Sequence, residues 1–274
     1  MSLDGLSINF ATIKQGGSFA TLVDACLAHG IKTISPWRDQ VHGIGLSEAA
    51  RIVEENGIRL SGHCRGGFFP ASDEQGRRNA IEDNKRAVDE AAAMRADCLA
   101  LVVGGLPAGS KDMAGARQMV EDGMAELLPY ARQMGVPLAI EPLHPFYAAD
   151  RACFNTLKQS LDLCDRLGAG TGVAIDVYHV WWDPDLEEQV ARAGRNGQIL
   201  AHHICDWLVP TKDPLNDRGM MGDGVIDLKG FRRMIEKAGF SGPQEVEIFS
   251  NDWNGRPIDE VLSTVVERYK MLNA

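Results

Sequence analysis

Short apolar runs alternate with longer segments of helical period eight times along this chain. The runs begin near Leu6, Lys32, Arg59, Cys98, Val136, Gly172, Gln198 and Gln244. Several of them follow a glycine, such as Gly30 or Gly135, that suits the left-handed position just after a helix. We therefore expect each run to be a buried strand that begins where a helix has ended.

Between these runs, the periodicity predicts helices over 73–96, 111–134, 227–238 and 257–272. Strands that alternate with helices form a parallel sheet with right-handed crossovers. Eight such units in about 250 residues match the size of a (β/α)8 barrel. The rival is a doubly wound sheet, but no Gly-x-Gly-x-x-Gly follows the first strand. We predict one α/β domain, a TIM barrel, over residues 1–274.

Composition narrows the class of protein further. A hydrophobic fraction of 45% and a charged fraction of 24% are ordinary for a globular enzyme. The net charge of -10 argues against a nucleic-acid partner, which selects a basic surface. No apolar run approaches the ~18 residues of a membrane span, and the six cysteines form no Cys-x-x-Cys pair. These features predict a cytoplasmic protein with reduced thiols and no membrane partner.

Four acidic or imidazole residues each lie near the end of an apolar run: Glu141, Asp176, His203 and Glu247. The carboxyl ends of barrel strands are where the active sites of this fold lie. Because an unpaired buried carboxylate costs several kcal/mol, we expect the four to share one divalent cation. Carboxylate oxygens and an imidazole nitrogen suit Mn²⁺, Mg²⁺, Co²⁺ or Zn²⁺. The alternative is that each residue pairs separately with an arginine.

These strand ends resemble the xylose isomerase-like TIM-barrel superfamily, in particular its sugar phosphate isomerase/epimerase and ketose 3-epimerase members. Glu141 in Ile-Glu-Pro and Glu247 in Val-Glu-Ile-Phe match the family's two glutamates. Asp176 is followed by His179, as in the family's Asp-x-x-His. The resemblance covers essentially the whole chain in element order and is most specific between residues 137 and 250.

The resemblance also implies the roles of these residues. His203 matches the histidine ligand because Asp206 follows it at the family's His-x-x-Asp/Glu spacing, so neighbouring His202 is expected to be structural. Four residues then bind one metal ion, and Glu141 and Glu247 serve as catalytic acid and base on opposite faces of a ketose.

The implied function is a divalent-metal-dependent sugar or polyol isomerase or epimerase. One glutamate removes the proton next to the carbonyl, the metal stabilises the cis-enediolate, and the other glutamate returns the proton. Tyr147 stands six residues after Glu141, where many family epimerases have a further glutamate, so the subclass stays open. The expected partner is a small sugar, polyol or sugar acid. Whether the chain forms a homo-oligomer, a dimer or a tetramer, is left open.

Further residues near strand ends are candidates for binding substrate. They are Trp37, Arg38, His63, His179, Asp206 and Arg218. Arg218 lies in a long segment, 206–223, of the kind that forms lids or binding loops. Packing or local salt bridges are the alternative for several of these residues.

Three other functions remain to be weighed against the isomerase. A keto-polyol dehydratase would use the same enediolate to expel a β-hydroxyl group. A nuclease of the endonuclease IV type shares the barrel but needs extra histidines for a trinuclear cluster, and the acidic charge disfavours it. A non-catalytic sugar-binding barrel is disfavoured because both glutamates are present.

Overall fold

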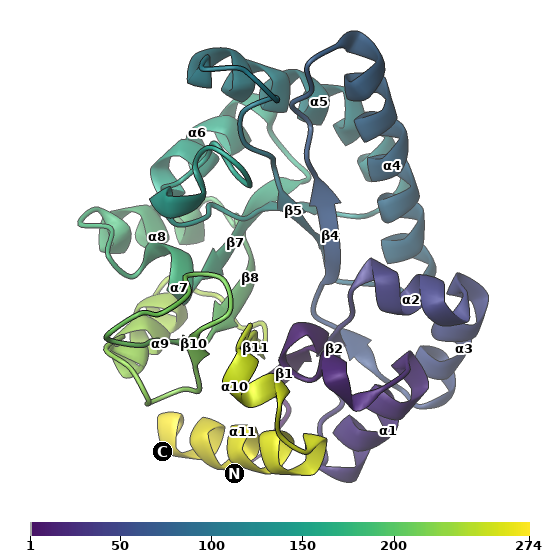
Figure 1. The fold of residues 1–274 in the computed structure, drawn as a ribbon, viewed down its shortest axis with the longest axis vertical. Coiled ribbons are helices and arrows are strands. Elements are labelled where there is room, and N and C mark those ends of the chain that lie inside the picture. Colours follow the sequence, from purple (N-terminus) through teal and green to yellow (C-terminus); the bar gives the residue numbers. More distant parts are fainter. Residues whose placement is uncertain (1) are drawn as a thin grey trace.

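The strands of the computed structural model, which describes residues 2–274, form a nine-stranded sheet that curls into a nearly closed parallel barrel (Figure 1). In chain order its strands are β1 (Leu6–Asn9), β2 (Thr33–Ser35), β3 (Arg59–Leu60), β4 (His63–Gly67), β5 (Leu99–Val102), β6 (Leu138–Ile140), β7 (Thr171–Asp176), β8 (Ile199–Ile204) and β11 (Gln244–Val246). Around the barrel they follow the order β3-β2-β1-β11-β8-β7-β6-β5-β4. Because β3 and β4 are consecutive pieces of one segment, divided only by Ser61 and Gly62, the first and last strands of this order complete the circle. The predicted (β/α)8 barrel is confirmed.

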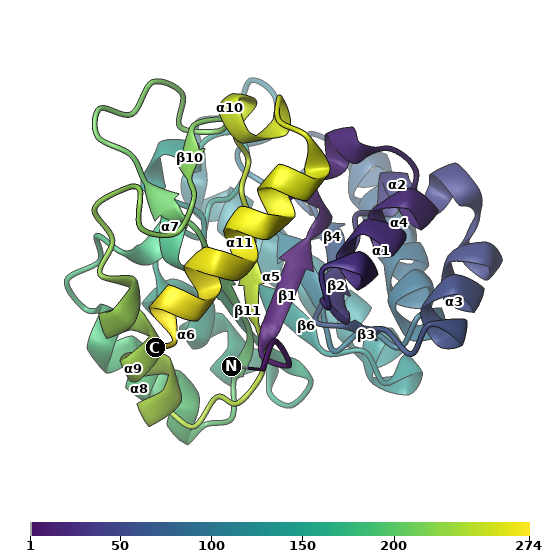
Figure 2. The same cartoon turned by 90° about the horizontal axis from the view of Figure 1, so that it is seen from below.

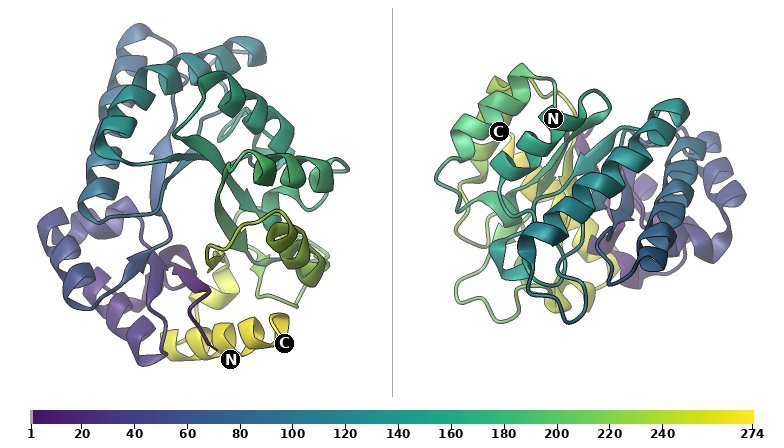
Figure 3. Two further views of the ribbon diagram at one scale, coloured as in Figure 1. Left: turned by 180° about the vertical axis from the view of Figure 1, so that it is seen from behind. Right: turned by 90° about the horizontal axis from the view of Figure 1, so that it is seen from above.

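Helices form the outer layer on all sides of the barrel (Figure 3). They are α1 (Phe19–Ala28), α2 (Arg38–Ile44), α3 (Leu46–Glu55), α4 (Glu74–Ala93), α5 (Met113–Met134), α6 (Leu157–Leu167), α7 (Val177–Val180), α8 (Leu186–Arg195), α9 (Leu228–Lys237), α10 (Asn251–Asn254) and α11 (Ile258–Leu272). Short 3₁₀ turns occupy η1 (Phe10–Thr12), η2 (Lys14–Gly16) and η3 (Pro145–Tyr147). The helices predicted over 73–96, 111–134, 227–238 and 257–272 correspond to α4, α5, α9 and α11.

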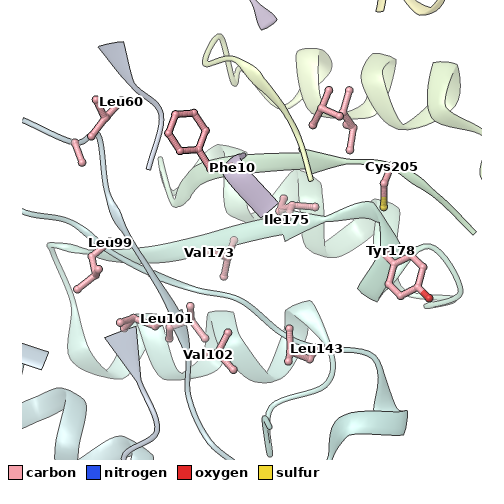
Figure 4. Close-up of a cluster of buried hydrophobic side chains, with 14 of the residues drawn as sticks. Phe10, Leu60, Leu99, Leu101, Val102, Leu143, Val173, Ile175, Tyr178 and Cys205 are labelled. Carbon is pink, nitrogen blue, oxygen red and sulfur yellow. The ribbon is translucent and has the colours of Figure 1, made fainter. Parts of the chain in front are cut away.

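Alternating side chains on the strands separate two cores. Strands covered on both faces read as continuous apolar runs, as β5 does with four buried residues in succession. The outward residues, such as Leu99, Leu101 and Val173, belong to the large cluster shared with the helices (Figure 4). The inward residues include a separate cluster of small side chains: Cys98, Ala139, Ala174 and Ala201. In this part of the barrel, small side chains fill the interior, so the barrel is packed and does not form a pore.

The long segment after β8 contains a short antiparallel pair, β9 (Asp206–Trp207) and β10 (Arg218–Gly219). The backbone N–H of Arg218 donates to the carbonyl of Phe249 at 3.0 Å, which ties this ribbon to the chain beyond β11. Figure 2 shows β10 with α7 and α10 at the end of the barrel toward which β1 and β11 point. The segment is therefore folded back over the carboxyl ends of the strands.

Two observations bear on the expected surroundings of the protein. Among residues 2–274, no helix combines the length and apolarity needed to span a bilayer. All six cysteines are buried and free of disulfide bonds, as expected from their spacing.

Candidate active site

Four neighbouring strands bring the predicted metal ligands together. Glu141 directly follows β6, Asp176 ends β7, His203 lies in β8, and Glu247 directly follows β11. These strands are adjacent in that order. All four side chains are buried, and one ligand atom from each lies within 4.8 Å of the others. Within residues 2–274, no other group of acidic, histidine and cysteine side chains is close enough to hold an ion.

His203 lies at the centre of this cluster. Its Nδ1 is 3.0 Å from Glu141 Oε1 and 3.7 Å from Glu247 Oε2. Burial opposes its protonation, but the charges of Glu245, Glu141 and Glu247 outweigh that penalty and raise the pKa of His203 well above its ordinary value. Burial and the charge of Glu141 raise the pKa of Glu247 to about 8, although the nearby Arg218 opposes this shift. The carboxylates are therefore held at an electrostatic cost that a cation would offset.

The second ring nitrogen of His203 faces a further carboxylate. Nε2 is 3.6 Å from Glu245 Oε1. Glu245 is itself fully buried and accepts hydrogen bonds of 2.7 Å from Asn9 Nδ2 and from Ser61 Oγ. Histidines that bind a metal through one nitrogen usually direct the other toward a carboxylate or carbonyl. The surroundings of His203 match that pattern.

This donor set fits a divalent cation. Three carboxylates and one imidazole nitrogen converge from one rim, with the histidine ring oriented by a fourth carboxylate. These are the ligand types that Zn²⁺ and Mn²⁺ take in proteins, with remaining positions left for water or substrate. Glu141, Asp176, His203 and Glu247 are the residues that could hold the ion.

Arg218 is the cation that the chain itself provides at this cluster. Its Nη1 donates to Asp176 Oδ2 at 2.9 Å and to Glu247 Oε2 at 3.1 Å. Burial opposes ionisation of Asp176, but the charge of Arg218 keeps the pKa of that carboxyl below its ordinary value. Nε of Arg218 is buried and has no hydrogen-bond partner among the described residues, so it is available to a ligand oxygen.

His179 lies beside Arg218 and is buried. Its Nε2 is 3.1 Å from Nη2 of Arg218, and the backbone N–H of His144 approaches its Nδ1 at 3.2 Å. Burial lowers the pKa of His179 to about 3, with Arg218 acting in the same direction. The ring is therefore neutral at physiological pH.

A cavity of about 180 Å³ opens directly over these residues. Glu141, Glu247, His179 and Arg218 are among the residues that line it. Trp37 forms part of its wall, packed edge-on against Phe249 with ring centroids 5.5 Å apart. A polar floor under aromatic walls is typical of a small-molecule site.

Three of the predicted substrate-binding residues lie outside this cavity. His63 is fully buried and bonds Glu90 of α4 at 3.0 Å, because the alternation at the start of β4 directs it outward. Arg38 donates to the same Glu90 and to Asp83, and lines the neighbouring cavity instead. Asp206 accepts from the backbone N–H groups of Gly222 and Ile226 at 2.9 and 3.0 Å, which holds the segment before α9 in place.

Some residues of the site were not among the predicted ones. Arg65, Arg151 and Tyr147 line the cavity, and Glu245 supports His203. Arg65 lies in β4 and is followed by two glycines, which is a local signal. The position of Arg151 depends on the path of the loop after β6, for which the sequence pattern has no signal. Glu245 had a signal: it precedes Glu247 by two residues and therefore shares its face of the strand.

Comparison with known proteins agrees with this geometry. A family model described as "Xylose isomerase-like TIM barrel" matches residues 23–268. An inosose isomerase of Bacillus velezensis is 22% identical, over 96% of this chain and 94% of the relative. The crystal structure of protein SMc04130 from Sinorhizobium meliloti 1021 shares 68% identity, with a TM-score of 0.98 and 99% of each chain covered. The structure of IolI protein with a bound zinc atom is 20% identical, with a TM-score of 0.85 over 98% of this chain and 97% of that one.

The family model covers most of the chain, including Glu141, Asp176, His203 and Glu247. The fold, the strand-end ligands and the relatives lead to one assignment. The chain belongs to the xylose isomerase-like TIM barrel family.

Proposed function

We propose that this protein is a divalent-metal-dependent isomerase or epimerase of a sugar or polyol. The observation that carries the proposal is that Glu141 and Glu247 line one cavity while their carboxylates converge with Asp176 and His203 beneath it. Two carboxylates that face the same bound substrate can remove and return a proton next to a carbonyl group. Positioned acid and base groups of this kind contribute roughly 10²–10⁴-fold to rate.

The other residues of the site have supporting roles in this proposal. Arg218 holds Asp176 and Glu247 in place through Nη1, and its buried Nε–H has no partner within residues 2–274, so it remains as a donor for a substrate oxygen. The neutral His179 ring stands beside it and lines the same cavity. When bound, the divalent ion supplies a Lewis acid that polarises the carbonyl.

The relatives support the same class of substrate. The curated relative is named an inosose isomerase, and a similar fold has been solved with zinc. The name of the first agrees with a hydroxyketone as substrate, and the second agrees with a divalent metal in this fold.

Proton exchange tests the proposed chemistry directly. The purified protein should contain about one divalent ion, and it should catalyse incorporation of deuterium from D₂O next to the carbonyl of a ketose or keto-inositol. The Glu247→Gln variant should lose roughly 10²–10⁴-fold of this exchange rate, because it removes one acid/base group. Glu267→Gln, at an exposed position of α11, is the matched control.

Three outcomes separate the alternatives. Exchange that is unchanged in Glu247→Gln would remove the acid/base assignment. A product lighter than the substrate by one water molecule would identify a dehydratase on the same site. Exchange with an isomeric product of equal mass would support the isomerase or epimerase.

A further inference from the structure

The cavity over the metal cluster is lined by three cationic side chains, Lys14, Arg65 and Arg151. We propose that the substrate carries an anionic group, a carboxylate or a phosphate, which these cations bind at the end away from the reacting carbons. This inference rests on the proposed function and specifies its class of substrate.

Arg65 provides the main support for an anionic ligand. It lies in β4, is half-buried, and its guanidinium carbon stacks 4.3 Å from the ring centroid of Phe68. Among residues 2–274 it has no hydrogen-bond acceptor and no ion-pair partner. Burial lowers its pKa, since a guanidinium with five N–H donors loses water without gaining an acceptor. A bound anion would supply the missing acceptors in the two-pronged geometry that arginine favours.

Arg151 and Lys14 add positive charge to the same cavity. Arg151 forms one long ion pair, with Nε 3.8 Å from Oδ2 of Asp150, which is beyond hydrogen-bonding distance. Lys14 is exposed and forms no ion pair with a described residue. The chain has a net charge of -10, yet three cations line this one cavity, two without a carboxylate partner among the described residues and one with only a long ion pair. Such a local focus of positive charge attracts anionic ligands.

The remaining cations near the site are already neutralised. Arg218 binds Asp176 and Glu247, and Arg38 binds Asp83 and Glu90. These two guanidinium groups therefore stabilise the protein's own carboxylates. Across residues 2–274, Arg65 and Lys14 have no such partner, and Arg151 has only the 3.8 Å ion pair with Asp150, so a ligand is the natural counter-charge.

The lining of two adjoining cavities places the anion at their junction. Lys14, Arg65, Trp37 and Phe249 line both the 180 Å³ cavity and an adjoining cavity of about 540 Å³. Arg65 and Lys14 thus stand at the junction, whereas Glu141 and Glu247 line only the smaller cavity. A substrate with its hydroxyketone at the glutamates would extend its far carbon toward the junction. The class of substrate is an α-hydroxyketone with a terminal carboxylate or phosphate.

Matched substrate series test this inference with the metal-loaded protein. Fructose, fructose 6-phosphate and fructuronate differ only at the carbon farthest from the carbonyl end, as do ribulose and ribulose 5-phosphate. We expect deuterium exchange with an anionic member to have kcat/KM at least about tenfold above its neutral counterpart, since charge-assisted hydrogen bonds are the strong ones. Whether the phosphate or the carboxylate member is preferred identifies the anion.

The Arg65→Met variant assigns the preference to this residue. We expect its KM for the anionic substrate to rise by about 10–100-fold, with kcat and the neutral substrate little changed. Arg65→Lys should restore part of the loss because it keeps the charge. Arg95→Met, at a highly exposed position away from the site, is the control. Equal use of neutral and anionic members, or an equal effect of Arg65→Met on both, would overturn the inference while leaving the proposed function intact.

A binding measurement keeps the inference testable if exchange fails altogether. Titration calorimetry with malonate and inorganic phosphate on the metal-loaded protein should show binding that weakens about tenfold or more in Arg65→Met. Erythritol serves as the neutral probe. Binding that persists unchanged in Arg65→Met would refute an anion site at Arg65. If the wild-type protein binds these anions, Arg65→Met does not, and the wild type still shows no exchange activity, only the proposed chemistry would be refuted.

Discussion

Glu245 shows how much one residue can contribute to the site without lining the cavity. It is fully buried, and its Oε1 lies 3.6 Å from Nε2 of His203. Asn9 and Ser61 donate to its two oxygens, so the carboxylate is fixed in position. A fixed acceptor on one ring nitrogen orients the imidazole and increases its basicity at the other nitrogen.

Replacing Glu245 should therefore weaken metal binding without unfolding the protein. We expect Glu245→Gln to lower affinity for Zn²⁺ or Mn²⁺ by about 10–100-fold, because the amide is a weaker acceptor for the histidine N–H. Competition with a chelator measures this affinity. Glu236→Gln, on the exposed face of α9, is the control. Equal affinities in the two variants would mean that Glu245 has only a packing role.

Some residues of the site could be predicted from the sequence, and others could not, for a physical reason. Glu141 and Asp176 could be recognised because each ends an apolar run, and a carboxylate there must reach the barrel rim. His63 also lies by a strand end, yet it faces Glu90 on the outside of the barrel. The strand is interrupted between β3 and β4, and its pairing with β5 shifts between Cys64 and Gly66. Local pattern cannot show which face a residue takes across such an irregularity.

At the scale of elements, Glu90 joins α4 to the barrel. It lies near the end of this long helix and is buried. Nε of Arg38 and Nε2 of His42 approach it at 2.9 Å, and Nε2 of His63 at 3.0 Å. Burial opposes its ionisation, but the hydrogen bonds from His63, Arg38 and His42 lower the pKa of Glu90 to about 2. The ionised carboxylate is therefore stabilised by folding.

This arrangement predicts a dependence of stability on pH. Because the folded pKa lies below the ordinary value, the stabilisation is complete above about pH 4.5 and is lost as pH falls toward 2. We expect Glu90→Gln to lower the free energy of unfolding at pH 7 by about 2 kcal/mol, allowing for partial solvent screening. In urea unfolding between pH 7 and pH 3, the free energy of unfolding should fall less steeply with decreasing pH in the variant than in the wild-type protein.

An exposed residue of the same helix provides the comparison. Glu82 pairs only with Lys85 near the surface. Glu82→Gln should therefore leave the free energy of unfolding at pH 7, and its decrease toward pH 3, nearly unchanged. If Glu90→Gln behaved like Glu82→Gln, the network of Glu90 would not contribute to stability.

Among the elements themselves, those with strong periodicity were predictable and those formed by tertiary contacts were not. The long helices α4 and α5 and the buried strand β5 follow their patterns closely. The ribbon of β9 and β10 has two residues per strand and no apolar alternation. It exists because Arg218 reaches the buried carboxylates and because Tyr147 and Tyr178 both donate to the carbonyl of Pro214. Such contacts are made by the whole fold and leave no local signature.

At the scale of the whole molecule, charge is distributed unevenly along the barrel axis. The carboxylates of Glu141, Asp176 and Glu247 are buried at one end. Arg218 and His203 are the cations in contact with them. Mutual repulsion of buried like charges lowers the stability of the folded state. A divalent ion that binds only the folded chain would stabilise it by mass action.

Metal binding should therefore be visible as a change in thermal stability. At a free ion concentration of 100 times Kd, the gain is about 2.7 kcal/mol, which for a chain of this size corresponds to a rise in Tm on the order of 5 °C. Differential scanning calorimetry with Mn²⁺, Mg²⁺, Co²⁺ and Zn²⁺, and with EDTA as reference, measures the rise and ranks the metals. Asp176→Asn should reduce it, because one ligand oxygen loses its charge and the position of Arg218 is no longer fixed by it. Glu236→Gln should keep the full rise. If every ion left Tm unchanged in the wild-type protein, the four strand-end side chains would not share a cation, and the proposed proton transfer would lose its electrophile.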